Sequence, residues 1–238
     1  MRTRAISVII PVYMEASNIR AAVDGTVWAL NDAGVDDYEL LVIDCLRRDG
    51  THDGTPEIAD ELARQNDRIR VFHNGYINLG AKFWVGVDTS KFPYVILVAG
   101  DNELRKEALR DILLHLGQAD ILITYPINPE IRPLIRRILS RIYVILINLS
   151  TGLGLRYYNG SCVHRTDVLR KVKDRNDNLV YMAKLLVQMI KQGYSYREIP
   201  IRLQKRGGGK PSVLTVINFL SVGRTIFELF WRYRILAK

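Results

Sequence analysis

Cysteine is scarce in this sequence, which has only Cys45 and Cys162 among 238 residues. Two cysteines without a CxxC pair or a neighbouring histidine cluster support neither a disulfide framework nor a zinc site. No stretch reaches the roughly 18 to 20 uninterrupted apolar residues that a spanning helix requires. The first apolar run meets Pro11 after a few residues, so it suits a first strand better than a signal peptide. We therefore expect a protein of a reducing compartment that is soluble or peripheral to a membrane.

Internal repeats, low-complexity linkers and a helix-turn-helix pattern are also missing. The apolar fraction of 48% and the charged fraction of 25% are typical of a folded protein. Lysine and arginine outnumber aspartate and glutamate by 34 to 25, giving a formal net charge of +9. This excess predicts an anionic partner, such as a phosphorylated substrate or a membrane surface, and solubility alone is the simpler explanation. Nucleic acid is not the expected partner, because no aromatic and basic residues are interleaved as in a nucleic-acid-binding sheet.

Short apolar runs alternate with helical patterns through the first half of the chain. Strands are predicted at residues 6–12, 38–43, 69–72 and 121–124, and in the apolar run that opens residues 94–103. Helices are predicted at residues 19–30, 55–65 and 106–116, and in the later half of 73–90. Thr55 is the predicted cap of the second helix, with Pro56 in its first turn. The alternation predicts an α/β fold with a mostly parallel sheet covered on both faces.

One predicted strand delivers acidic side chains to the edge of this sheet. Residues 94–103 read YVILVAGDNE, an apolar run that ends in Asp101, Asn102 and Glu103. In open α/β sheets, ligands bind in the crevice beyond the carboxyl ends of the strands. Two carboxylates at that position predict a metal or sugar site, and capping of the next helix by Asp101 is the structural alternative.

The second half of the chain contains two segments that mix basic and apolar residues. In residues 131–155, an aliphatic run follows a cluster of arginines, namely Arg132, Arg136, Arg137 and Arg141. Such a helix can lie in a membrane interface with its cations near anionic headgroups, or it can be an ordinary buried helix. Residues 213–238 carry too many charges to span a membrane, but they suit either an interface or a partner helix.

Four stretches, in order, resemble family 2 glycosyltransferases with a GT-A fold, particularly the dolichyl-phosphate mannose synthase branch. They are SVIIPVYMEASNI at 7–19, DGTHDGT at 49–55, NLGAKFWVG at 78–86 and VAGDNE at 98–103. The resemblance covers nearly the whole chain. It implies a GT-A domain over residues 1–212, with an acceptor-side interfacial helix within 131–155, and an amphipathic helical tail over 213–238.

The resemblance assigns the first two stretches to the nucleotide of a sugar donor. The residues that it places beside the nucleotide are Pro11, Tyr13 and Glu15. Asp44 or Asp49 would accept a hydrogen bond from the base, and Asp53 would brace the loop. Residues 45–48 separate two aspartates that are normally adjacent in the family, so either can be the base-binding carboxylate.

The donor diphosphate is assigned to basic residues from distant parts of the chain. In the third stretch, Gly80 would let the backbone approach closely and Lys82 would meet a phosphate. The segment at residues 181–209 resembles the helix, strand and R-x-x-G loop that close over the diphosphate. There Arg206 matches the family arginine, and Lys210 would assist it.

The fourth stretch resembles the family's D-x-D motif, which binds a divalent cation. Ala99 replaces the first aspartate, Asp101 keeps the second, and Glu103 stands where some members use Gln or Glu. Because such a cation keeps water and phosphate oxygens in its shell, one or two carboxylates can suffice. We expect Asp101 and Glu103 to hold Mg²⁺ or Mn²⁺, with Asp101 as a catalytic residue.

The acceptor is predicted from the arginines and from a missing carboxylate. Where the family usually has a glutamate in the helix after residue 180, this chain has Lys184. A phosphate monoester is largely dianionic at neutral pH and needs positioning cations instead of a general base. The predicted acceptor is therefore a polyprenyl phosphate of the dolichyl or undecaprenyl type, with its phosphate received by Arg136, Arg137 and Arg141, the last of them catalytic.

Together these features predict an inverting glycosyltransferase that uses a UDP- or GDP-linked sugar. It would work at the cytoplasmic face of a membrane and be peripherally bound there. One alternative is transfer to the hydroxyl of a glycan or soluble acceptor, with Asp174 or Asp177 as base. The other is a non-catalytic homologue that binds a nucleotide sugar.

Overall fold

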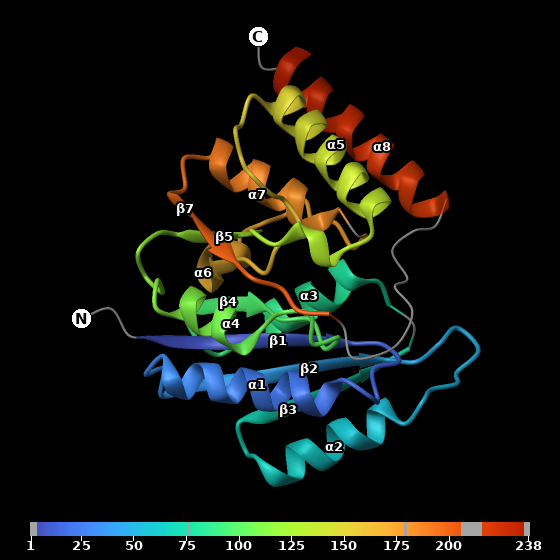
Figure 1. Ribbon diagram of the computed structural model, residues 1–238, viewed down its shortest axis with the longest axis vertical. Coiled ribbons are helices and arrows are strands. Elements are labelled where there is room, and N and C mark those ends of the chain that lie inside the picture. Colours follow the sequence, from blue (N-terminus) through green and yellow to red (C-terminus); the bar gives the residue numbers. More distant parts are fainter. Residues whose placement is uncertain (1–3, 76, 179, 206–215, 236–238) are drawn as a thin grey trace.

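The computed structural model describes residues 4–75, 77–178, 180–205 and 216–235 (Figure 1). Its centre is a seven-stranded sheet in the order β3-β2-β1-β4-β6-β5-β7. The strands are β1 Ala5–Val12, β2 Asp37–Cys45, β3 Ile69–Asn74, β4 Tyr94–Leu97, β5 Ile121–Pro126, β6 Val163–Arg165 and β7 Tyr196–Ile201. Among these strands, β6 alone runs antiparallel to its two neighbours, β4 and β5. The predicted mostly parallel sheet is confirmed.

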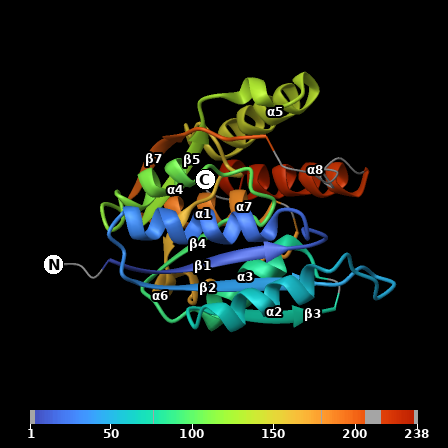
Figure 2. The same cartoon turned by 60° about the horizontal axis from the view of Figure 1, so that its bottom comes forward.

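Helices cover both faces of the sheet (Figures 1 and 2). One face carries α1 Ile19–Asp32, α2 Thr55–Gln65 and α4 Lys106–Leu113. The other face carries α3 Leu79–Thr89, α6 Thr166–Leu169 and α7 Tyr181–Lys191. Successive residues of a strand point to opposite faces, so Ile10 packs in the first layer and Ile9 in the second. Both faces are apolar, which explains the continuous apolar runs of the sequence.

A third group of helices lies beyond the second layer. Helix α5 Leu134–Thr151 follows a 3-10 turn at Pro129–Ile131 and lies beside α8 Val216–Phe230, which continues as the π-helix Trp231–Ile235 (Figure 1). Arg234 Nε donates to the carbonyl of Leu149 at 3.0 Å, and Lys184 Nζ of α7 lies 2.8 Å from Glu228 Oε1 of α8. These contacts join α8 to both α5 and α7. None of the described helices is long and apolar enough to cross a membrane.

The start of α2 differs from the prediction. Gly54 occupies the cap position with a φ of 93°, and Thr55 is the first residue of the helix. Asp53, the residue before the cap, accepts a hydrogen bond at its Oδ1 from Thr55 N at 3.2 Å. The prediction that Thr55 caps this helix is wrong, because Gly54 takes the left-handed conformation at the cap position. The Thr55 hydroxyl instead accepts a hydrogen bond from Glu15 N.

Candidate active site

The predicted site residues gather where β1, β2 and β4 end. Thr55 Oγ1 accepts a hydrogen bond from Glu15 N at 2.9 Å, and Asp53 Oδ2 accepts one from Ala16 N at 3.1 Å. The loop after β1 is thus tied to the start of α2. Asp53 braces this loop, as the family resemblance predicted.

The two candidate base-binding aspartates have different environments. Asp44 lies in β2 and is only 1% exposed. Its Oδ2 lies 3.2 Å from His73 Nδ1, while its buried Oδ1 has no hydrogen-bond partner among the described residues. Asp49 is exposed and binds the backbone and hydroxyl of Thr51 at 3.0 and 2.7 Å. The hydrogen bond from the Thr51 hydroxyl is the main cause that lowers the pKa of Asp49.

Lys82 lies at the carboxyl end of β1. The residue is 4% exposed, and its ammonium donates to the carbonyl of Val12. The same nitrogen lies 5.6 Å from the centre of the Tyr13 ring. No carboxylate of the described residues forms an ion pair with Lys82, although a buried charge is costly without one. A bound anion at this edge of the sheet would supply the missing charge.

The acidic turn after β4 packs against β1. Gly100 N donates to the carbonyl of Pro11 at 3.2 Å, and a Cβ on Gly100 would lie 2.5 Å from Val12 Cγ1. Asp101 is half-buried, and its Oδ1 accepts a hydrogen bond from Glu103 N at 3.1 Å. It does not cap α4, which begins at Lys106. Asp101 therefore stands at the predicted crevice with a structural role inside its own turn.

Glu103 is paired with two arginines, Arg132 just before α5 and Arg136 in its first turn. Its Oε2 lies 3.0 Å from Arg132 Nη2, and its Oε1 lies 3.5 Å from Arg136 Nη1. Arg132 Nη1 also donates to the Tyr157 hydroxyl at 3.0 Å. Burial opposes the charge of Arg132, yet Tyr157 and Glu103 outweigh it and raise the pKa of the guanidinium. The acidic turn and the arginine cluster, predicted as separate sites, are in direct contact.

A family model for glycosyl transferase family 2 matches residues 7–173. The chain belongs to glycosyl transferase family 2. The predicted family is confirmed.

The chain is also similar to two named proteins. Over 237 residues, the chain is 25% identical to "Glycosyltransferase AglD" of Haloferax volcanii, covering 95% of this chain and 37% of that protein. Over 218 residues, it is 29% identical to "Polyprenol monophosphomannose synthase" of Mycolicibacterium smegmatis, covering 86% of this chain and 79% of that protein. The chain thus spans little more than a third of the length of the Haloferax protein.

The fold is shared with solved glycosyltransferases. The crystal structure of glucosyl-3-phosphoglycerate synthase from Mycobacterium tuberculosis in complex with UDP superimposes with a TM-score of 0.69 at 15% identity. The match covers 97% of this chain and 80% of that one. Another structure of that protein, with a TM-score of 0.69, contains Mn²⁺ and UDP-glucose. The predicted GT-A fold is confirmed by this likeness.

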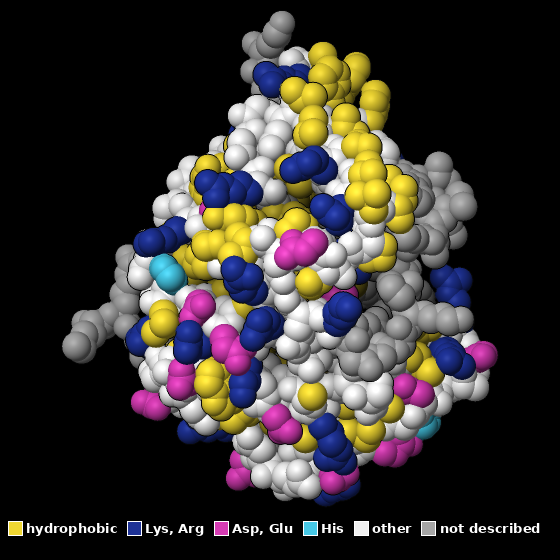
Figure 3. All heavy atoms as spheres, viewed as in Figure 1, with side chains coloured by type: hydrophobic (Ala, Val, Ile, Leu, Met, Phe, Trp, Pro, Cys, Tyr) yellow, Lys and Arg dark blue, Asp and Glu magenta, His cyan; other side chains and the backbone are white. Residues whose placement is uncertain are grey.

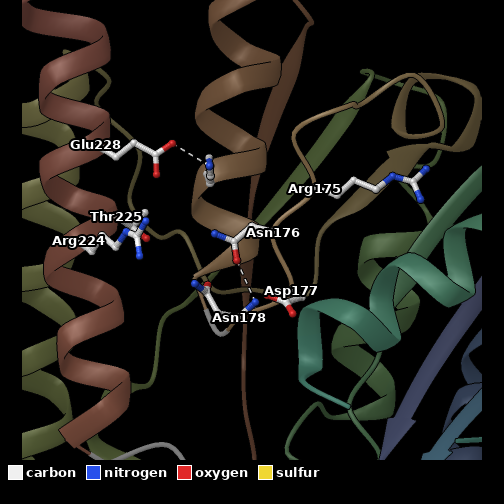
Figure 4. Close-up of a pocket in the computed structure, with 8 residues that line it drawn as sticks. Arg175, Asn176, Asp177, Asn178, Arg224, Thr225 and Glu228 are labelled. Carbon is white, nitrogen blue, oxygen red and sulfur yellow. Dashed lines mark hydrogen bonds and ion pairs between the residues drawn. The ribbon is translucent and has the colours of Figure 1, made fainter.

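A polar pocket of about 490 Å³ lies between α8 and the loop before α7 (Figure 4). Its lining residues are Arg175, Asn176, Asp177, Asn178, Lys184, Arg224, Thr225 and Glu228. Gly80 joins this loop to α3, since Gly80 N donates to the carbonyl of Asp177 at 3.0 Å. A Cβ on Gly80 would lie 2.6 Å from the Asp177 carbonyl carbon. Close approach of two backbones is therefore the reason for glycine at this position.

The two alternative bases also lie in this region. Asp174 Oδ2 lies 3.2 Å from Lys184 Nζ and 3.4 Å from Arg232 Nη1, so its carboxylate is paired with two cations. The Asp177 residue is exposed at the pocket. Of the two, Asp177 is the better candidate for a general base, because Asp174 pairs with Lys184 of α7 and with Arg232 of the π-helix that follows α8.

Few of the described side chains could bind a divalent cation at this site. Among the described residues, no three histidine, cysteine, aspartate or glutamate side chains come together as metal ligands do. Asp101 carries a carboxylate in the turn after β4, and the carboxylate of Glu103 pairs with Arg132 and Arg136. The residues present fit a cation held mainly through Asp101, with water and phosphate oxygens completing its shell. The assignment of Glu103 as a metal ligand stays a prediction, and its ion pairs argue against it.

Several predicted residues are not brought to the crevice by described contacts. Arg137 and Arg141 are exposed on α5, and Arg206 and Lys210 lie outside the described residues. Conversely, His73 and Tyr157 contact predicted site residues but were not predicted. Their contacts join residues far apart in the chain, and neither belongs to a recognisable motif.

Replacing Glu103 with glutamine distinguishes its ion pairs with Arg132 and Arg136 from its predicted role as a metal ligand. We expect Glu103→Gln to raise the KM for the acceptor about tenfold, because Arg132 and Arg136 lose the charge that orients them. Binding of Mn²⁺, measured by electron paramagnetic resonance, should change little. Glu107→Gln is the matched control, since this carboxylate at the start of α4 also pairs with an arginine, Arg105. A marked loss of Mn²⁺ affinity with an unchanged acceptor KM would show that Glu103 is a metal ligand after all.

Proposed function

We propose that this glycosyltransferase moves a sugar from a nucleotide-diphosphate sugar to a polyprenyl phosphate at a membrane surface. The observation that carries the proposal is helix α5, which joins an exposed apolar face to arginines in contact with the acidic turn. The relative named polyprenol monophosphomannose synthase supports a lipid-phosphate acceptor. Mg²⁺ or Mn²⁺ is the proposed cofactor, bound chiefly by Asp101.

The apolar face of α5 lies on the side that faces away from the core. Its exposed residues recur at helical spacing, namely Leu134, Ile135, Ile138, Ile142, Ile145, Leu146 and Leu149. Figure 3 shows hydrophobic side chains in a band over this helix. On α8, Phe227 and Trp231 are also exposed and stack at 6.1 Å. Apolar surfaces of this extent beside arginines suit a membrane interface.

The chemistry requires no general base from the protein. An oxygen of the lipid phosphate attacks the anomeric carbon, and the bond from that carbon to the nucleoside diphosphate breaks. The configuration at the anomeric carbon inverts, and the diphosphate leaves with the bonding electrons. In this proposal Lys82 would contact the diphosphate, and a divalent cation held by Asp101 would supply further charge neutralisation at the leaving group. Arg136, supported by Arg132, would position the lipid phosphate.

Transfer to a hydroxyl is the second candidate function. Asp177 favours it, since this exposed carboxylate lies at the pocket and has no cation paired with it among the described residues. Loss of transfer to a soluble acceptor on Asp177→Asn, with no product on lipid, would favour this function.

The proposed function is tested by offering both kinds of acceptor. Purified protein is incubated with Mg²⁺ or Mn²⁺, a panel of UDP- and GDP-linked sugars, vesicles containing polyprenyl phosphate, and soluble glycans. We expect labelled sugar in the lipid fraction with at least one donor. Labelling of the soluble acceptor alone would contradict the lipid assignment.

Membrane binding should depend on the apolar face of α5. Leu149 is 64% exposed and Ile142 is 48% exposed, so the double change Ile142→Glu and Leu149→Glu should leave the fold intact. We expect binding to vesicles with anionic lipid to fall at least about tenfold, because each side chain loses its burial in the acyl region. Leu114→Glu, at a residue 47% exposed after α4, is the matched control in a vesicle-flotation assay. Equal flotation of all three proteins would exclude this face as the membrane contact.

A further inference from the structure

The polar pocket between α8 and the loop before α7 is not used in the proposed transfer to a lipid phosphate. Two of its three cationic side chains are already paired. Arg175 Nη1 lies 2.6 Å from Asp88 Oδ2, and Lys184 Nζ lies 2.8 Å from Glu228 Oε1. Arg224 of α8 lines the same pocket and forms no ion pair with the described residues. Its guanidinium is therefore available to an anion.

The loop before α7 presents two side-chain amides whose orientation is fixed. Asn176 Oδ1 accepts a hydrogen bond from Asn178 N at 2.9 Å, and Asn178 Oδ1 accepts one from Val180 N at 2.9 Å. These bonds turn the oxygen of each amide toward the backbone, which leaves the NH₂ group as the free end. Figure 4 shows the Asn176 nitrogen on the side that faces α8. The loop thus contributes two hydrogen-bond donors to the pocket.

The hydroxyl of Thr225 is a further donor. This residue lies on α8 beside Arg224, lines the pocket and is only 3% exposed. Its hydroxyl has no hydrogen-bond partner in the part of the chain that the structure describes. A buried hydroxyl without a partner costs free energy, which a ligand in the pocket would offset. Figure 4 shows Arg224 and Thr225 directed from α8 toward the loop.

The backbone of α7 adds to the preference for an anion. The loop leads into the N-terminal end of this helix, where unpaired N–H groups carry a partial positive charge and the first turn holds no acidic residue. The Asp177 carboxylate opposes an anion, but Figure 4 shows it directed away from α8, on the side of α3. Donors therefore approach from α8, from the loop and from a helix end. This arrangement suits a tetrahedral phosphate better than a planar carboxylate.

The position of the pocket indicates where such a phosphate comes from. Arg224, Phe227 and Trp231 occupy positions i, i+3 and i+7 of one helical stretch, so they share a face. Phe227 and Trp231 are exposed and suit a membrane interface. The pocket volume of about 490 Å³ exceeds that of a phosphate ion, so a polar group attached to the phosphate also fits.

We propose that this pocket binds the headgroup phosphate of an anionic phospholipid that is not a substrate. The side chains that donate to the phosphate are Arg224, Thr225, Asn176 and Asn178. The bound lipid would hold α8 at the membrane surface, and its site is separate from the arginines beside Glu103. The inference rests on the membrane location in the proposed function, but not on its sugar donor or its acceptor.

Vesicle flotation of the full chain, without nucleotide or polyprenyl phosphate, tests this inference. Phosphatidylcholine vesicles receive equal negative charge either from phosphatidylglycerol or from oleate, which has no phosphate. We expect binding at least about fivefold tighter with phosphatidylglycerol. Arg224→Gln should weaken this binding about tenfold, and Thr225→Val, which keeps the charge and the volume, about fivefold. Arg64→Gln, at an exposed residue of α2, is the matched control and should bind as the original protein does.

Other results would overturn the inference. Unchanged affinity of folded Thr225→Val for phosphatidylglycerol, or equal binding to both kinds of vesicle, would show diffuse electrostatic attraction instead of a site. Calorimetric titration with glycerol 3-phosphate distinguishes the source. Binding that Thr225→Val abolishes, with flotation unaffected, would assign the pocket to a soluble phosphate ester and refute the lipid. If flotation behaves as predicted but no sugar reaches polyprenyl phosphate, the lipid site stands and the proposed acceptor fails.

Discussion

Replacing Asp101 with asparagine should abolish sugar transfer while leaving the fold intact. Asparagine keeps an oxygen that can accept the hydrogen bond from Glu103 N, now 3.1 Å from Asp101 Oδ1, so the turn should persist. It removes the negative charge that we propose holds the divalent cation. Since a cation at a leaving diphosphate is worth several kcal/mol, we expect kcat to fall about 1000-fold or more.

The effect of Asp101→Asn needs two further measurements. Thermal unfolding should show a midpoint close to that of the original protein, and Mn²⁺ binding should weaken. Asp111→Asn, in the exposed pair with Arg110 on α4, is the matched control and should keep full activity. Retained transfer in Asp101→Asn would place the metal site elsewhere.

Replacing Lys82 with methionine should have the second largest effect. The Lys82 ammonium is buried beside β1 and pairs with no carboxylate among the described residues, and we propose that a bound diphosphate is its counter-ion. Methionine has a similar length and suits the apolar surroundings, but it carries no charge. We expect the KM for the nucleotide sugar to rise about 30-fold to 100-fold, as charge-assisted hydrogen bonds to phosphate contribute 1.5 to 3 kcal/mol each.

The matched control for Lys82→Met is Lys106→Met. Lys106 Nζ lies 4.5 Å from the centre of the Trp28 ring, and its residue is exposed at the start of α4. Initial rates at varied donor concentration should be normal for this control. If Lys82→Met changes only the thermal midpoint and leaves the KM for the donor unaltered, Lys82 is a structural contact between α3 and β1.

Local patterns in the sequence were sufficient to predict most of the sheet. The continuous apolar runs at β1, β2 and β4 arise because helices bury both faces, and alternation with helices then predicts parallel pairing. Strand β6 was missed, since it is only three residues long, Val163–Arg165, and its antiparallel pairing depends on distant partners. A strand of three residues is too short to show the alternation of apolar and polar side chains by which strands are predicted.

The site was harder to predict, because its decisive contacts join distant residues. The sequence could not separate Asp44 from Asp49, since the insertion of residues 45–48 disrupts the family spacing. Burial of Asp44 and its bond to His73 distinguish them, and that bond spans 29 positions. The ion pair between Glu103 and Arg132 likewise spans 29 positions. The sequence alone predicted Glu103 as a metal ligand, and this ion pair argues against that role.

The most direct test compares two acceptors that differ only in a terminal phosphate. Polyprenyl phosphate and polyprenol of equal chain length are placed in identical vesicles, with the protein, Mn²⁺ and a radiolabelled nucleotide sugar that the donor panel identifies. Labelled lipid should form with polyprenyl phosphate and not with polyprenol, because the phosphate oxygen is the proposed nucleophile. Equal labelling of polyprenol, or labelling of soluble glycans alone, would contradict transfer to a lipid phosphate.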